Sequence, residues 1–247
     1  MASKGTASAL IVLASLLLTW PGGAHAEPYA GLFAGVALSN STDVDLKLSP
    51  ATFNDVELNR SVVFGGKAGF FLEAPVLGGN TGLELEVYHF RPDIDRQTVL
   101  VSATGGTGAT TFDAADLHVT AIGLNGLYRF PLARDGDFPH GRLQPYAGVG
   151  LGAFIAHLET RTTVLDVNMD FGDTDVRVGV QALAGARFFL TPHLALFGEY
   201  KFVHTDDLKF NLVSDPGTRG GLTTGEVNKL QFDLTTHMLQ AGIAYHW

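Results

Sequence analysis

The stretch that decides the fold class is LQAGIAYHW, residues Leu239–Trp247. Small or polar residues alternate in it with apolar ones, which are Leu239, Ala241, Ile243, Tyr245 and Trp247. Because successive side chains of a β-strand point to opposite faces, the alternation predicts a strand with one apolar and one polar face. Many half-buried strands share this pattern, so the stretch indicates a strand without showing what surrounds it.

Seven further segments show the same alternation. They are residues 29–38, 61–72, 81–90, 117–130, 144–157, 177–189 and 194–204. In the segment 81–90, for example, Leu83 and Leu85 alternate with Glu84 and Glu86. Together with the last stretch, these segments predict an all-β chain of eight antiparallel strands.

Charge is segregated between the two faces of these segments. The more apolar face has no Asp, Glu, Lys or Arg. Seven charged residues of the other face form a candidate lumen network, namely Lys67, Glu84, Glu86, Arg129, Arg187, Glu199 and Lys201. A lipid-facing Lys or Arg at mid-bilayer costs about 2–4 kcal/mol, so a membrane would impose such segregation. The pattern therefore favours a transmembrane barrel over a soluble barrel or β-sandwich, whose charged face would point outward.

Aromatic residues gather at one end of the apolar face. They are Phe70, Tyr128, Phe130, Phe188, Tyr245 and Trp247. Such a group is typical of the aromatic girdle that a barrel places at the membrane interface. Tyr29 falls on the opposite face and does not fit the girdle unless its strand begins with a bulge.

The connections between the segments alternate in length. Short ones cover residues 73–80, 131–143 and 191–193, and the other four are longer and polar. In an outer-membrane barrel the short connections are periplasmic and the long ones extracellular. The sequence thus predicts an orientation as well as a fold.

The first 26 residues have the features of an export signal. Lys4 precedes a mostly apolar run over residues 9–20, and residues 24–26 (Ala-His-Ala) match the small-x-small pattern of signal peptidase cleavage. The apolar run is shorter than the roughly 20 residues that a membrane-spanning helix needs, which disfavours an anchor. We expect cleavage after Ala26 and one barrel domain over residues 27–247.

Composition excludes several classes of function. The chain has no cysteine, so disulfides, zinc–thiolate sites and thiol catalysis are ruled out. Without Lys4 there are 15 basic against 25 acidic residues, a net charge of −10. This balance argues against nucleic acid as a partner. It suits loops that face a lipopolysaccharide surface.

Three motifs carry a resemblance to a known family. They are GLYRF at 126–130, QPYAGVGLG at 144–152 and GARFFLTPHL at 185–194. The chain resembles the small bacterial outer-membrane barrels of the opacity-like, OmpA/OmpX-type β-barrel domain family. The resemblance implies an eight-stranded antiparallel up-and-down transmembrane β-barrel with short periplasmic turns and long extracellular loops. It also implies that Tyr245 and Trp247 belong to the signal read by the barrel-assembly machinery.

The lumen charges allow two hypotheses. Eight strands enclose a space just wide enough to be filled by side chains, and an unpaired charge there would be costly. The first hypothesis is a structural plug of salt bridges. The second is a switchable gate for ions.

Other candidate motifs indicate no chemistry. Gly148, Gly150 and Gly152 lie at strand spacing with no helix after them, so they predict small inward-facing residues and no nucleotide loop. No histidine has serine two residues later, which is the pairing that an outer-membrane lipid A deacylase would need. His89, His118 and His204 stand at strand ends, where we expect contact with the membrane interface.

We therefore expect a non-enzymatic outer-membrane protein that acts in envelope integrity or, through its surface loops, in adhesion. The expected partners are outer-membrane lipid and lipopolysaccharide, the assembly machinery and a surface ligand bound by the loops. No cofactor or resident metal is expected, although acidic pairs such as Asp43 and Asp45 are able to bind Ca²⁺. The alternatives are a narrow channel for ions or small solutes and, less favoured, an outer-membrane lipid hydrolase.

Overall fold

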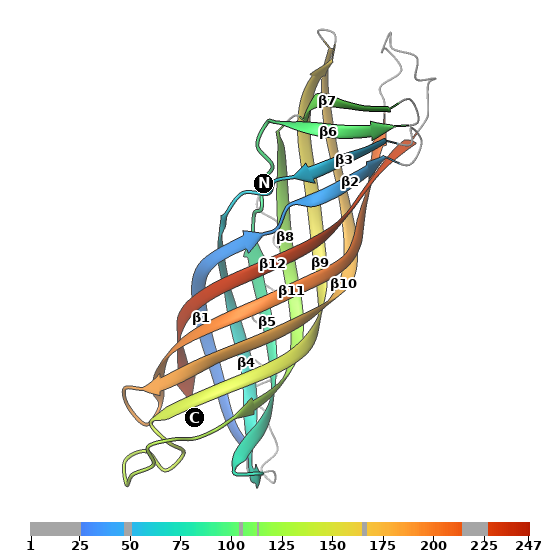
Figure 1. Cartoon of the computed structure of the whole chain (residues 1–247). Helices are drawn as coiled ribbons and strands as arrows, with labels where there is room; N and C mark the ends of the chain where they lie inside the picture. Colours follow the sequence, from blue (N-terminus) through green and yellow to red (C-terminus); the bar gives the residue numbers. More distant parts are fainter. Residues whose placement is uncertain (1–25, 47–50, 104–105, 113, 165–166, 214–226) are drawn as a thin grey trace.

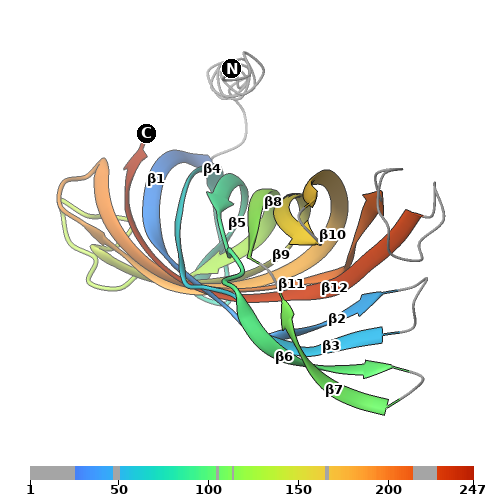
Figure 2. The same cartoon turned by 90° about the horizontal axis from the view of Figure 1, so that it is seen from above.

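A computed structural model describes residues 26–46, 51–103, 106–112, 114–164, 167–213 and 227–247. Eight strands form a closed ring in which each pairs antiparallel with the next and β12 pairs with β1 (Figures 1 and 2). In ring order they are β1 (Ala26–Ser39), β4 (Ser61–Val76), β5 (Gly79–Phe90), β8 (Ala115–Arg129), β9 (Leu143–Val164), β10 (Val167–Phe189), β11 (Leu194–Val213) and β12 (Val227–His246). Each of the eight predicted segments overlaps one ring strand, so the all-β antiparallel prediction is confirmed.

The described residues contain twelve strands, and the four that lie outside the ring were not predicted. They are β2 (Thr42–Leu46), β3 (Ala51–Val56), β6 (Gln97–Ala103) and β7 (Gly106–Phe112). They pair in the order β2-β3-β6-β7 and form a shelf beside the ring, which we call the loop sheet (Figure 2). The loop sheet joins the ring where Leu46 and Asp45 of β2 pair with Leu230 and Gln231 of β12.

The two ends of the ring differ. At the girdle end, where Trp247 lies, the connections are short. β4 and β5 are joined by Leu77 and Gly78 alone, both with positive φ (49° and 84°), as tight hairpin turns require. The predicted connection 73–80 is thus mostly strand. The loop sheet marks the opposite end, the loop end (Figure 1).

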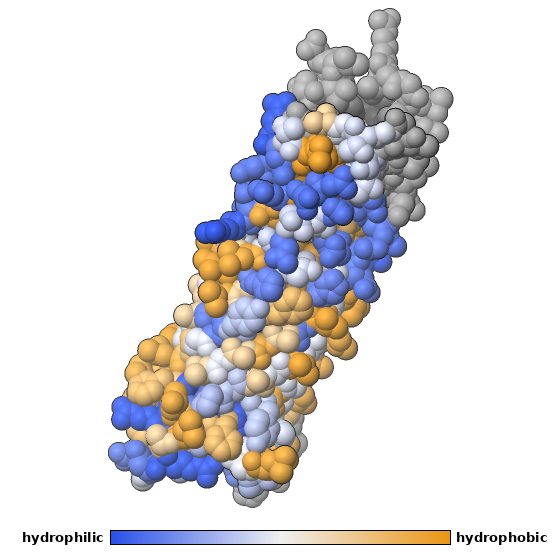
Figure 3. Space-filling model, in the orientation of Figure 1, coloured by the Kyte–Doolittle hydropathy of each residue, from blue (hydrophilic) through white to orange (hydrophobic). Residues whose placement is uncertain are grey.

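The apolar face of the strands points outward. Val149 is 70 % exposed, and Leu32 and Val62 are also exposed. Phe130, Phe188, Tyr245 and Trp247 of the predicted girdle are exposed as well. Figure 3 shows apolar residues gathered over the part of the barrel nearer the girdle end, with hydrophilic residues towards the loop end. No helix in the described part of the chain is long and apolar enough to cross a membrane.

The buried charged residues of the inward face lie in the half nearer the girdle end. In the half nearer the loop end, apolar side chains fill the lumen, among them Phe33, Phe90, Leu117 and Phe154. The same cluster continues into the loop sheet through Val44, Val56 and Val99. We call it the apolar core. It joins the barrel and the loop sheet into one packed body.

Candidate functional site in the barrel lumen

Six of the seven predicted lumen charges come together in the polar half of the lumen. Three are carboxylates and three are cations, so the group is neutral overall. Its members, which we call the lumen cluster, are Lys67, Glu84, Glu86, Arg187, Glu199 and Lys201, and all are buried. β4, β5, β10 and β11 supply them from inward-facing positions.

Two lysines hold the three carboxylates together. Lys67 Nζ lies 2.7 Å from Glu199 Oε2 and 3.3 Å from Glu84 Oε1. Lys201 Nζ donates a hydrogen bond to Glu86 Oε2 and lies 3.5 Å from Glu199 Oε1. Glu199 is therefore shared between both lysines. The arrangement is a network rather than a set of separate pairs.

Arg187 is held mainly by aromatic rings. Its Nη2 lies 3.5 Å from Glu84 Oε2, while its guanidinium carbon lies 4.0 Å from the ring centre of Tyr29, 4.9 Å from that of Tyr146 and 5.0 Å from that of Phe71. A guanidinium within about 6 Å of a ring is attracted by the ring's quadrupole. The rings therefore replace part of the hydration that burial removes.

Neutral side chains, which no charge pattern in the sequence indicated, complete the network. Tyr29 Oη donates to Glu84 Oε2 at 2.6 Å, and Tyr146 Oη donates to Glu199 Oε2 at 2.9 Å. Asn125 Nδ2 donates to Glu84 at 3.2 Å and to Glu86 at 3.0 Å. The position of Tyr29 on the polar face was the signal for its role, and no bulge is needed to explain it.

Inward glycines make room for these side chains. A Cβ atom at Gly150 would lie 2.2 Å from Asn125 Oδ1, and one at Gly123 would lie 2.4 Å from Gln181 Nε2. Gln181 Nε2 in turn donates to Glu86 Oε1 at 2.8 Å. The network thus depends on the absence of side chains on the neighbouring strands.

Arg129 does not join the lumen cluster, which corrects the prediction of one network of seven charges. Arg129 Nη2 lies 2.5 Å from Glu27 Oε2, and His246 Nδ1 lies 2.6 Å from Glu27 Oε1. The physical reason is that β1 begins at Ala26, before the predicted start of the strand, so Glu27 provides a carboxylate at the girdle end. The ring of Phe71 separates the two groups and contacts Arg129 at 4.2 Å.

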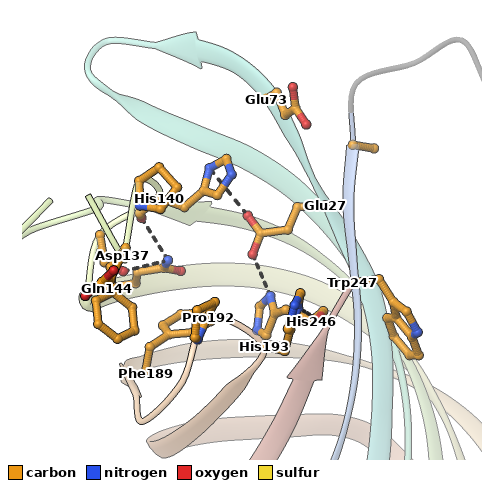
Figure 4. A pocket seen from close by; sticks show the side chains of 14 residues that line it. Glu27, Glu73, Asp137, His140, Gln144, Phe189, Pro192, His193, His246 and Trp247 are labelled. Atoms are coloured by element: carbon orange, nitrogen blue, oxygen red, sulfur yellow. Dashed lines mark hydrogen bonds and ion pairs between the residues drawn. The ribbon is translucent and has the colours of Figure 1, made fainter. Parts of the chain in front are cut away.

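A cavity of about 240 Å³ opens below Arg129 at the girdle end. Figure 4 shows Glu27 between His140 and His246, with His140 Nδ1 3.9 Å from the Glu27 carboxylate. Trp247 also borders this cavity, and its backbone N–H donates to the carbonyl of Pro28 at 3.1 Å. The ring of Trp247 meets that of Tyr245 edge to face, with 5.3 Å between ring centres. The two predicted assembly-signal residues therefore lie together at this end.

The described residues contain no group of three His, Asp or Glu side chains that would hold a metal ion. The acidic pair of β2 makes hydrogen bonds within the loop sheet. Asp45 accepts a hydrogen bond from Thr52 Oγ1 at 2.7 Å, and Asp43 accepts one from the backbone of Asp55 at 3.0 Å. The lumen thus holds paired charges and packed rings.

The family model for the outer membrane protein beta-barrel domain matches residues 6–246. The chain belongs to this family. Its location is accordingly the bacterial outer membrane, and the resemblance seen in the sequence motifs is confirmed.

Solved structures of outer-membrane proteins are similar to this chain at low sequence identity. The outer membrane protease OmpT from Escherichia coli has 10 % identity and a TM-score of 0.53, with 90 % of this chain and 97 % of that chain covered. The outer membrane protein OprG from Pseudomonas aeruginosa has 17 % identity and a TM-score of 0.48, with 91 % and 96 % covered. Neisserial surface protein A has 14 % identity and a TM-score of 0.43, with 88 % and 96 % covered. No curated protein sequence matches the chain.

Proposed function

We propose that the protein is a non-enzymatic, eight-stranded transmembrane barrel with a sealed lumen that acts through its loop sheet at the cell surface. Its role is adhesion to a surface ligand or the maintenance of envelope integrity. The loop end is extracellular and the girdle end, with its short turns, is periplasmic. The observation that carries the proposal is the apolar core, which is continuous from the lumen into the loop sheet.

Two layers support a sealed lumen. In the polar half, Lys67 and Lys201 are almost fully buried and contact three carboxylates from two strands, β5 and β11. In the other half, buried aromatic rings such as Phe90 and Phe154 take the place of water. An eight-stranded barrel is narrow enough for side chains to fill it, so these layers leave no room for a wide pore.

The loop sheet supports a role in surface contact. Its four strands present exposed side chains that include Leu100, which is 57 % exposed, and Thr98. Asn54 Nδ2 donates to the carbonyl of Leu100 at 3.0 Å, which joins neighbouring strands. A sheet held in this way offers a partner a surface of fixed shape.

Single-channel recording tests the seal. The wild type should give weak or intermittent conductance in planar bilayers. A large and steady conductance would overturn the sealed barrel and favour the alternative of a narrow channel for ions or small solutes.

A deletion tests the loop sheet. Replacing residues 97–112 by a short Gly/Ser linker should abolish binding to host cells or surfaces, while the folded barrel still migrates differently on gels before and after boiling. Full binding by this variant would contradict a role for the loop sheet in contact.

The enzymatic alternatives need a direct assay because OmpT, a protease by name, has this fold. Purified protein should hydrolyse neither peptides nor phospholipid or lipid A. Turnover that is lost on heat unfolding would overturn the non-enzymatic proposal.

The proposed assembly signal at Tyr245 and Trp247 is tested by the yield of folded protein. Removing Trp247 should reduce the amount of folded protein in the outer membrane far more than Val149→Ala, because Val149 supplies only a local lipid contact. Equal yields of the two variants, measured by the gel shift on boiling, would refute the role of Trp247.

A further inference from the structure

Histidines mark the boundary of the apolar outer surface towards the loop end. Five of them point outward there: His89, His118, His157, His204 and His237. On several strands the next outward position towards the loop end is charged, as with Arg91 after His89 and Asp116 beyond His118. The histidines thus lie where the apolar belt gives way to charge, which is the level of lipid headgroups.

Three residues at this boundary form a compact basic patch, which we define as His89 of β5, Arg91 just after β5, and His118 of β8. Arg91 Nε donates to His118 Nδ1 at 3.1 Å, and Arg91 Nη2 lies 2.7 Å from His118 Nε2. The ring centres of His89 and His118 are 5.9 Å apart. The patch therefore brings one guanidinium and two imidazoles together.

Arg91 differs from the cations of the lumen. Lys67, Arg187 and Lys201 each lie within ion-pair distance of a carboxylate, whereas the described residues place no such carboxylate at Arg91. Arg91 is exposed, and only two of its five N–H groups face His118. Its remaining N–H groups are therefore available to a ligand.

The surface below the patch is apolar. Phe64 is 55 % exposed, and its ring lies 5.7 Å from that of His89. Leu32, further towards the girdle end on β1, is also exposed. A ligand bound at the patch can therefore place an anionic group on Arg91 and an acyl chain along the wall.

We propose that the basic patch binds a phosphate of an outer-leaflet glycolipid, the lipid A portion of lipopolysaccharide. Guanidinium groups bind phosphate through two parallel hydrogen bonds, which an imidazole beside them supplements. The acyl chains of the same molecule cover Phe64. The inference rests on the orientation proposed above, with the loop end outside.

Titration of lipid A tests the patch. The full barrel in phosphatidylcholine nanodiscs is mixed with lipid A carrying both phosphates, or with dephosphorylated lipid A, and binding is measured. Arg91→Gln should weaken binding of phosphorylated lipid A about tenfold, the loss expected for charge-assisted hydrogen bonds. His118→Gln should weaken it less. Dephosphorylated lipid A should bind wild type and Arg91→Gln equally weakly.

The matched control is Arg134→Gln, which removes an exposed arginine from the turn at the girdle end. It should bind lipid A as the wild type does. The proposal would be overturned if Arg91→Gln bound phosphorylated lipid A as tightly as the wild type does, or if the wild type bound both forms of lipid A equally. It would also be overturned if inorganic phosphate displaced lipid A as effectively as free lipid A does. Thiol labelling of Leu100→Cys on intact cells tests the orientation separately, so failure of the orientation is distinguishable from failure of the patch.

Discussion

The two halves of the lumen are filled by opposite chemistry on the same strands. β5 supplies Glu84 and Glu86 to the lumen cluster and, a few residues further on, Phe90 to the apolar core. In the polar half each cation is matched by a carboxylate, while in the apolar half aromatic and aliphatic side chains pack as in a soluble protein. The lumen is thus closed by ion pairs in one half and by packed apolar side chains in the other.

The two halves of the lumen should lose stability to different extents when one side chain is substituted. Removing one member of a buried ion pair leaves the other charge uncompensated in a medium that solvates it poorly. Removing apolar atoms leaves a cavity whose cost depends on how far the neighbours relax. The polar half should therefore be the more sensitive to single substitutions.

The largest effect should come from Lys67→Met. Glu84 and Glu199 would lose their shared cation, and the unfolding free energy should fall by about 3–5 kcal/mol. Urea titration in lipid vesicles measures this loss. The control is Asp95→Asn, an exposed loop change, which should leave stability unaltered. A Lys67→Met barrel as stable as wild type would show that the lumen cluster does not act as a unit.

An intermediate effect is expected in the apolar half. Leu117 is fully buried, and Leu117→Ala should lower the unfolding free energy by about 2–4 kcal/mol through the cavity it creates. Conductance should not change, because the lumen cluster still closes the other half. A rise in conductance of Leu117→Ala above that of the wild type would show that the lumen cluster alone does not close the barrel.

The smallest loss of stability should come from replacing both members of a buried ion pair together. The double variant Lys201→Met with Glu86→Leu removes both charges together, and such replacements are often close to neutral. It should be more stable than Lys201→Met alone, as a double-mutant cycle in urea would measure. If the double variant lost as much unfolding free energy as the two single variants together, the two charges would not be coupled.

The ring could be predicted from the sequence because its strands are long and alternate clearly. The loop sheet could not, because β2 has only five residues and its partners Leu230 and Gln231 lie far away in the chain. Pairing over such a distance leaves no local pattern. The alternation also did not indicate that Phe33 and Phe154, on the inward face, belong to an apolar core.

The lumen charges were visible because each is isolated on an otherwise small or polar face. Their neutral partners were not, since Asn125 and Gln181 carry no charge that would single them out. Glu27 was missed for another reason, because it directly follows the expected cleavage site and precedes the predicted start of the strand. Charge alone therefore identified the cluster but not the contacts that complete it.

The attachment of β2 to β12 sets an order of events in folding. Residues 45 and 46 pair with residues 230 and 231, so the loop sheet gains its anchor only when the last ring strand is in place. Contacts between such distant parts of the chain form late, because closing a long loop is entropically costly. A cell that displays the complete loop sheet therefore displays barrels whose ring has already closed.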